Sequence, residues 1–195
     1  MDRRLGALGA CLLAGLSLAA LAELPADFEA LMAKAQAGDA EAQYSVGKAL
    51  QKDRQYNDAF HWFEKASAQG HLPAMNSFAQ FYELGIAVRQ SHQRGFEIYS
   101  RAADLGSAEA MWNISNMYRA GELGESPDFV AACAWAIRAE RFSDPADNTW
   151  RSLKSRVERV LPRLEHALTS DQLAQCKKDG EAWSPRQAKG TTSGS

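Results

Sequence analysis

A short motif recurs three times in the chain, and this repetition limits the possible folds more than any other feature of the sequence. Each copy begins with glycine and ends with alanine: Gly38-Asp39-Ala40-Glu41-Ala42, Gly70-His71-Leu72-Pro73-Ala74 and Gly106-Ser107-Ala108-Glu109-Ala110. The copies start 32 and 36 residues apart. A period of this length is typical of solenoids built from stacked helix pairs. The sequence therefore predicts a repeat protein whose core forms between neighbouring helices.

Small side chains occupy matched positions in the three repeats. These positions hold Gly47, Ala79 and Ser115 in the first half of each repeat and Ala59, Gly95 and Ala132 in the second half. Two helices approach closely only where a side chain at their crossing is short. We therefore expect two helices in each repeat, in the first repeat at about Ala40–Gln51 and Asp58–Gln69. A glycine after each second helix is expected to end it in a left-handed conformation.

Further matched residues resemble the Sel1-like repeat family, a relative of the tetratricopeptide repeats. They are Gly47, Trp62, Lys65, Ala66 and Gly70 in the first repeat, Tyr82, Gly85, Val88, Tyr99, Ala102 and Gly106 in the second, and Tyr118, Gly121, Asp128, Ala132, Trp135 and Ala139 in the third. Ala87 and Ser91 depart from the glycine and aspartate that are usual in the family's loop. The resemblance implies an all-α fold, an α-α superhelix (solenoid) of about three helix pairs followed by C-terminal capping helices.

These features divide the chain into segments. We expect a signal peptide at 1–22, Sel1-like repeats at 23–141, capping helices at 142–183 and a disordered polar tail at 184–195; the repeats run at about 38–69, 70–105 and 106–141. A terminal repeat must cover its exposed apolar side, so capping helices are expected at Asp147–Leu161 and Ser170–Trp183. Pro162 and the Thr169-Ser170 pair are expected to separate them.

The first 22 residues have the layout of a secretory signal peptide. Arg3 and Arg4 precede an uncharged run from Leu5 to Ala22 that ends in small residues at the −3 and −1 positions. We expect cleavage after Ala22 and a periplasmic or secreted protein with no membrane span. Two alternatives stay open: a retained membrane helix, and lipidation at Cys11, which follows the lipobox-like Leu8-Gly9-Ala10.

Cleavage after Ala22 leaves two cysteines, Cys133 and Cys176. An even pair in an oxidising compartment favours a disulfide. Two unpaired cysteines that pack as small buried residues are the alternative.

Charge and motifs favour a protein without catalytic activity. The formal net charge is -2 and the charges are scattered, so nucleic acid is not expected as a partner. The four histidines have no metal-binding spacing, and neither a metal nor a cofactor is expected. Ser45 and Lys48 match the Ser-x-x-Lys pattern of serine β-lactamases, but the Ser-Asp-Asn and Lys-Thr-Gly elements are missing. A β-lactam-binding or β-lactam-hydrolysing enzyme is therefore a remote alternative.

The expected partner is another protein, bound by the first helices of the repeats. In stacked helix pairs these helices line the concave side, and residues three and four apart share one face. The residues expected to contact the partner are Ser45, Lys48, Ser77, Gln80, Trp112, Asn113 and Asn116. Trp112 is the aromatic residue that we expect to anchor the partner.

The resemblance to Sel1-like proteins implies an interaction scaffold in the bacterial periplasm. Small exported proteins of this type also resemble immunity proteins that neutralise secreted, lipase-type effector toxins, which gives a more specific alternative. A second alternative is a scaffold for assembling envelope polysaccharide or peptidoglycan. The surface of a solenoid varies freely over a fixed core, so the choice of partner depends on surface residues and not on the repeat pattern.

Overall fold

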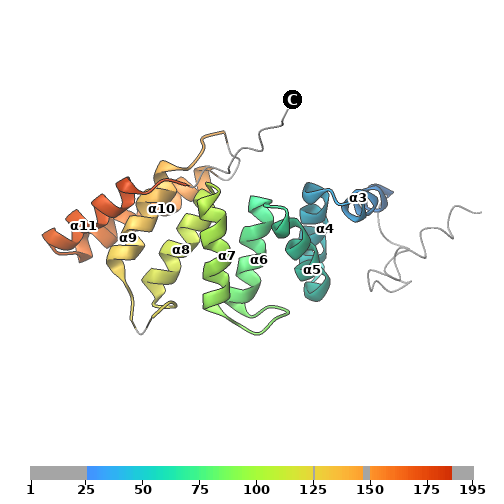
Figure 1. Cartoon of the computed structure of the whole chain (residues 1–195), viewed down its shortest axis with the longest axis horizontal. Helices are drawn as coiled ribbons and strands as arrows, with labels where there is room; N and C mark the ends of the chain where they lie inside the picture. Colours follow the sequence, from blue (N-terminus) through green and yellow to red (C-terminus); the bar gives the residue numbers. More distant parts are fainter. Residues whose placement is uncertain (1–25, 125, 147–149, 186–195) are drawn as a thin grey trace, which may run out of the picture. The chain divides into compact units, whose positions relative to one another are not determined.

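The computed structural model describes residues 26–124, 126–146 and 150–185 (Figure 1). Within these ranges every regular element is an α-helix. The helices are α3 (Ala26–Gln36), α4 (Ala40–Lys52), α5 (Tyr56–Ala68), α6 (Leu72–Leu84), α7 (His92–Asp104), α8 (Ala108–Ala120), α9 (Phe129–Arg141), α10 (Trp150–Ala167) and α11 (Ser170–Ala182). The all-α prediction is therefore confirmed. The expected signal peptide, with Cys11, and positions 186–195 of the expected tail lie outside the described residues.

The chain divides into two compact units, and the boundary lies between Ala74 and Met75, within the first turn of α6. The first unit contains α3, α4 and α5, with Val46 and Phe63 fully buried among them. The second unit contains most of α6 and all of α7 to α11. Its fully buried side chains include Phe81, Tyr99, Met111, Ile114 and Met117.

The repeated motif ends one helix and begins the next. Gly70 and Gly106 have φ angles of +80° and +94°, a left-handed conformation that glycine adopts without steric cost. The second residue of each motif then accepts a hydrogen bond from the backbone N–H of the last: Asp39 from Ala42 (2.7 Å), His71 from Ala74 (3.2 Å) and Ser107 from Ala110 (3.2 Å). These bonds satisfy N–H groups that have no partner within the new helix.

The small residues predicted to lie at helix crossings do so in the second unit. The Ser115 hydroxyl of α8 donates a hydrogen bond to the carbonyl oxygen of Ala132 in α9, at 2.7 Å. A Cβ atom added at Gly95 of α7 would lie 3.3 Å from the carbonyl oxygen of Ala79 in α6. In both pairs, the small residue of the first helix faces the small residue of the second.

α10 is longer than the sequence predicted. It extends from Trp150 to Ala167, with Pro162 inside it, so the expectation that Pro162 ends this helix was wrong. Proline removes one hydrogen bond from a helix interior. Val157 and Leu164 are buried on either side of Pro162, and their packing outweighs the lost bond. The next helix begins at Ser170 as predicted, with Thr169 and Gln172 forming a capping box.

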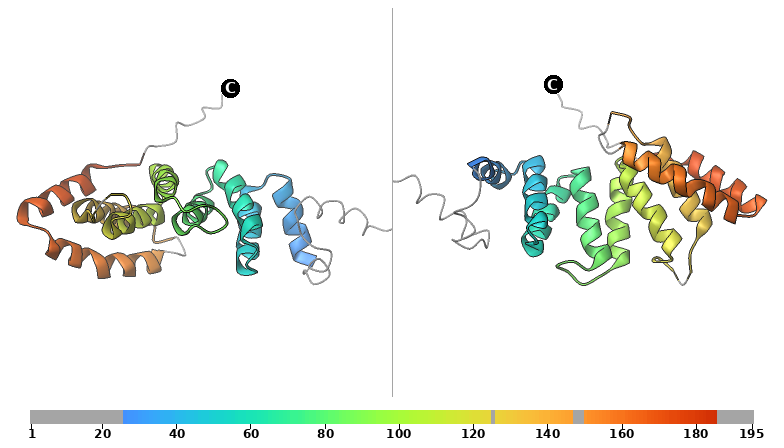
Figure 2. Two further views of the ribbon diagram at one scale, coloured as in Figure 1. Left: turned by 90° about the horizontal axis from the view of Figure 1, so that it is seen from below. Right: turned by 180° about the vertical axis from the view of Figure 1, so that it is seen from behind.

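α9 lies between α10 and α11 (Figure 2, left). Only Cys176 and Gly180 of α11 are buried. Cys176 forms a disulfide with Cys133 of α9, with their Cα atoms 5.8 Å apart. The structure thus favours the bridge over two free thiols. A Cβ atom added at Gly180 would lie 2.9 Å from Cβ of Ile137, so the two helices touch at this glycine.

Two arginines of α9 bind the C-terminal end of α11. Arg141 donates to the carbonyl oxygen of Gly180 (2.8 Å), and Arg138 donates to that of Asp179 (3.0 Å). The last carbonyls of a helix have no partner within it and carry its negative dipole end, so a cation stabilises them. The guanidinium carbon of Arg138 also lies 4.2 Å from the ring centroid of Trp135. The bridge, these arginines and the ring of Trp183, whose centroid lies 5.7 Å from those of Trp135 and Phe142, hold α11 on α9.

Candidate protein-binding site

The predicted contact residues of the first unit lie on α4 and are reachable from solvent. Ser45 is half-buried and Lys48 is exposed. The Lys48 amine donates to the side chain of Gln51, at 3.2 Å. It is therefore directed away from Ser45, whereas a lysine that activates a serine nucleophile must lie within hydrogen-bonding reach of its hydroxyl. The pair belongs to a polar helix surface, and its geometry gives no support to the enzyme alternative.

The predicted residues of the second unit fall into two groups. Gln80 and Asn116 are half-buried, and Asn116 accepts a hydrogen bond from Arg119, at 3.2 Å. Ser77 is only 9% exposed, so its side chain belongs to the core and not to a binding face. The Asn113 Nδ2 atom is buried and has no hydrogen-bond partner among the described residues. Of these four residues, Gln80 and Asn116 are the two whose side chains we expect a partner to contact.

Trp112 is not the exposed anchor that the sequence predicted. It is 4% exposed, and the guanidinium carbon of Arg156 from α10 lies 5.7 Å from its ring centroid. Arg156 also forms an ion pair with Glu109 of α8. α10 therefore lies over the face of α8 that was expected to be open. The repeat pattern places Trp112 on the first-helix face correctly, but it does not show which later helix packs there.

A polar cluster connects α6, α7 and the α8–α9 loop. The Tyr99 hydroxyl donates to the Glu83 carboxylate (2.8 Å), and His92 Nδ1 lies 3.4 Å from an oxygen of Glu122. Burial raises the pKa of Glu83 above its ordinary value of 4.5; the Tyr99 hydrogen bond opposes this, and the charge of Glu122 adds to it. Burial, with Glu83 nearby, also raises the pKa of Tyr99, which therefore stays a donor.

The raised pKa of Glu83 predicts a pH-dependent stability. The folded protein holds this proton more tightly than the unfolded chain, so the contribution is complete below pH 4.5 and is lost as the pH rises through the folded-state pKa. Glu83→Gln keeps an acceptor for Tyr99 and cannot ionise. We expect its free energy of unfolding, measured with urea, to fall less than that of the wild type between pH 4.5 and neutral pH.

The exposed Glu140 offers a matched control. Glu140→Gln should retain the pH dependence of the wild type, because its side chain is in solvent. Identical pH profiles for the wild type and Glu83→Gln would show that Glu83 is not the group responsible.

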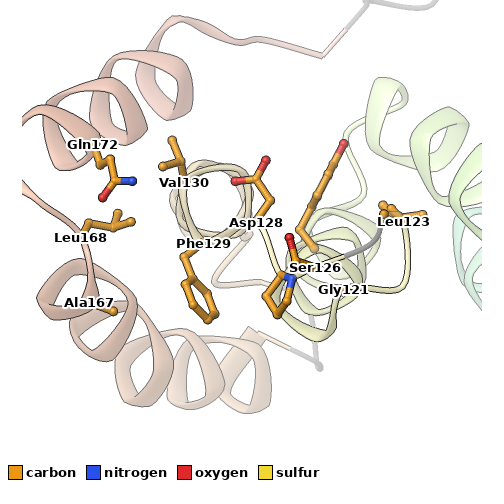
Figure 3. A pocket seen from close by; sticks show the side chains of 12 residues that line it. Gly121, Leu123, Ser126, Asp128, Phe129, Val130, Ala167, Leu168 and Gln172 are labelled. Carbon is orange, nitrogen blue, oxygen red and sulfur yellow. The ribbon is translucent and has the colours of Figure 1, made fainter.

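A pocket of about 490 Å³ opens beside the start of α9 (Figure 3). Figure 3 shows Asp128 and Phe129 between Leu168 on one side and Gly121 on the other. Phe129 is 41% exposed, and Asp128 accepts a hydrogen bond from the N–H of Ala131, at 2.9 Å. The volume suits a small ligand or a partner's side chain. The polar side chains that line it are Tyr118, Ser126, Asp128 and Gln172, beside the apolar Leu123, Phe129, Val130 and Leu168.

The structure also bears on metals and membranes. In the described ranges, no three or more histidine, cysteine, aspartate or glutamate side chains are grouped so as to hold a metal ion. None of the helices there combines the length and the apolar character that crossing a membrane requires.

Comparison with known proteins identifies the repeats. A family model described as the Sel1 repeat matches residues 33–71, 72–107 and 108–141, together more than half of the chain. Among solved structures, c5321, a protective antigen of uropathogenic Escherichia coli strains with an SLR fold, aligns with a TM-score of 0.66 and 24% identity. The match covers 79% of this chain and 32% of that one. This likeness confirms the predicted helical-repeat fold.

Two further proteins resemble the chain. A Sel1 repeat protein from Oxalobacter formigenes aligns with a TM-score of 0.53 and 23% identity, over 68% of this chain and 98% of that one. Chitin synthase regulatory factor 3 of Schizosaccharomyces pombe is 27% identical over 92 residues, which make up 47% of this chain and 10% of the relative. The chain thus spans a small part of this relative. Sel1 repeat proteins generally mediate protein–protein interactions, and their scaffolds are generally non-catalytic.

Proposed function

Because the chain belongs to the Sel1 repeat family, we propose that it is a non-catalytic protein-binding module of the bacterial periplasm. The observation that carries this proposal is the arrangement of the repeats. Small buried residues fix the helix pairs, while polar residues such as Lys48, Gln80 and Asn116 stay accessible on the first helices. A fixed core with a variable polar surface suits recognition of another protein.

The proposed compartment rests on two features. A disulfide between Cys133 and Cys176 persists in the periplasm or outside the cell, whereas a cytoplasm keeps thiols reduced. The segment 1–22 has the layout of a signal peptide. Both features favour export.

Export makes a prediction about the N-terminus. We expect the protein isolated from the periplasmic fraction to begin at Glu23, because signal peptidase cleaves after small residues such as those that end at Ala22. N-terminal sequencing or the intact mass measures this directly. A lipid-modified protein that begins at Cys11, or an intact protein held in the membrane fraction, would replace this proposal with one of the two alternatives.

Affinity capture tests the binding function. The purified protein is immobilised and exposed to envelope and secreted fractions of its own organism, and the bound proteins are identified by mass spectrometry. We expect one protein in stoichiometric amount, and a weaker yield with the variant Gln80→Glu plus Asn116→Glu, both within the second unit, if its first helices make the contact. Failure to retain any protein, or nitrocefin hydrolysis by the purified protein, would contradict a non-catalytic binding module.

A second candidate function is the neutralisation of a toxin delivered to the periplasm. The fixing of α11 on α9 by the disulfide and by Arg138 and Arg141 favours it, because a preorganised surface loses little entropy on binding and suits tight inhibition. Co-expression with a lipase-type effector encoded beside it tests this idea. Protection of the cell would establish an immunity protein, whereas co-purification with polysaccharide or peptidoglycan enzymes would favour an assembly scaffold.

A further inference from the structure

α10 presents a basic face to solvent. Its buried side is formed by Leu153, Val157 and Leu164, which pack it onto the second unit. The charged residues on its exposed side are Arg151, Lys154, Glu158, Arg159 and Arg163. Lys154 pairs with Glu158, at 3.7 Å. This leaves three arginines, Arg151, Arg159 and Arg163, without an ion pair in the described part of the chain; we call them the α10 arginine face.

The charges of α10 are placed where they disfavour folding. α10 has no acidic residue in its first turn, and Arg151 lies there, beside the positive end of the helix dipole. Arg159 and Arg163 are four residues apart, so their like charges lie next to each other on the helix surface. A helix selected for stability alone would have the opposite arrangement. The loss of stability that these unfavourable charge positions cause indicates that the arginines serve a function other than folding.

The charge of α10 also contrasts with that of the rest of the chain. α10 contains five basic and two acidic residues, a net charge of +3. The whole chain has a net charge of -2, so the residues outside α10 together carry -5. A local surface of opposite sign steers and orients a partner of complementary charge.

The position of α10 brings this face to the side where a partner was expected. Arg156, on the inward side of the helix, binds Glu109 and covers Trp112 of α8. A partner that approaches the first-helix face of the third repeat therefore meets α10 instead of Trp112.

We propose that the α10 arginine face docks an acidic surface of a partner protein. This proposal rests on the protein-binding function and names the surface that the second unit uses. Arg159 and Arg163 are four residues apart, about one helical turn, so their guanidinium groups lie side by side on the helix surface. A pair with this spacing matches two carboxylates one turn apart on one side of a partner helix. Guanidinium groups suit this role because they bind carboxylates through two parallel hydrogen bonds.

A protein fits this face better than a membrane does. Helices that bind a membrane surface bury an apolar face in the lipid, and the apolar face of α10 is already packed inside the protein. The large exposed hydrophobic residues of the described ranges are Tyr56, Leu84, Leu105 and Phe129, and none of them belongs to α10. Over 151–167, where the burial of the side chains is described, the helix thus offers charges and no large exposed hydrophobic residue.

The test uses a synthetic helical peptide of about 14 residues with glutamates along one face, labelled with a fluorophore. Binding to the purified protein is measured by fluorescence anisotropy at low and at physiological salt. We expect Arg159→Glu plus Arg163→Glu to weaken binding by at least about tenfold, because each reversal replaces attraction by repulsion. The matched control is Arg89→Glu plus Arg101→Glu, which reverses two exposed arginines outside α10 and gives the same net charge. It should bind as the wild type does, and a peptide with glutamine in place of glutamate should not bind.

Four results would overturn the proposal. The first is equal affinity of the wild type and the α10 variant, with circular dichroism showing that both are folded. The second is an equal loss in the control variant, which would mean that net charge alone decides. The third is that the wild type binds vesicles of phosphatidylglycerol and phosphatidylethanolamine, that the α10 variant does not, and that the peptide does not bind. The ligand of the α10 arginine face would then be lipid. A natural partner that the α10 variant still captures would leave the protein-binding function intact and overturn this surface alone.

Discussion

Replacing Cys133 and Cys176 with alanine is expected to lower the free energy of unfolding by about 4 kcal/mol. The bridge joins residues that are 43 positions apart, and a cross-link over a loop of this length removes about that much chain entropy from the unfolded state. The effect should be large here because α11 buries only Cys176 and Gly180. Without the bridge, Arg138, Arg141 and the ring contacts of Trp183 would remain to hold the helix. Urea unfolding of the oxidised wild type and the double variant measures the difference.

Hydrogen exchange shows which helix is destabilised when the disulfide is removed. Loss of the bridge should speed exchange of the α11 amides far more than those of α6 or α7, because the bridge joins α11 to α9 and neither of the other two helices carries one of its cysteines. Treating the wild type with a reductant should reproduce the behaviour of the double variant, and the reductant should not change the variant further. Unchanged unfolding and unchanged protection of α11 would mean that the arginines and Gly180 suffice to hold this helix.

Phe63→Ala is expected to destabilise the first unit by about 3–5 kcal/mol, the usual cost of removing a large aromatic side chain from a packed core. Phe63 is 0% exposed and lies in α5, against α4. Tyr56→Ala, at a position in the same helix that is 38% exposed, should cost much less. Thermal or urea unfolding followed by circular dichroism compares them. Similar losses for the two variants would contradict the assignment of Phe63 to the core.

Gly47 of α4 allows a second test of the contact between α4 and Phe63. A Cβ atom added at Gly47 would lie 2.7 Å from a ring carbon of Phe63, so Gly47→Ala should destabilise the wild type by overpacking. In the Phe63→Ala background the ring is gone, and the same change should stabilise α4 by up to about 1 kcal/mol, since alanine favours a helix over glycine. The sign of the effect should therefore reverse between the two backgrounds. Effects of the same sign and size would show that Gly47 and Phe63 are not in contact.

Much of the fold could be predicted because its determinants are local and repeated. The motif from Gly106 to Ala110 contains the glycine that ends one helix and the serine that begins the next, and the structure uses both residues in this way. The small residues at matched positions predicted the crossings, and Ser115 and Ala132 meet at one of them. Such features depend on backbone geometry and side-chain size, which the sequence states directly.

The parts that could not be predicted depend on contacts without a period. Arg156 binds Glu109 across 47 positions, and no repeat pattern shows that this pair forms and that α10 then covers Trp112. The expectation that Pro162 ends a helix followed from local chemistry, which packing overrides in α10. The pocket beside Phe129 was missed for a similar reason, because its walls come from segments that are distant in the chain.

The pairing of a stop and a start within each five-residue motif affects how a chain of this kind can change in length. A segment that starts at the capping residue of one motif and ends at the glycine of the next contains both an N-terminal cap and the glycine that ends its last helix. Duplication or deletion of such a segment therefore creates no helix end without its cap and no new type of turn. The difference between periods of 32 and 36 residues shows that length also varies within a repeat while these junctions stay intact. The motif is thus the natural point at which evolution, or an engineer, can add or remove a repeat.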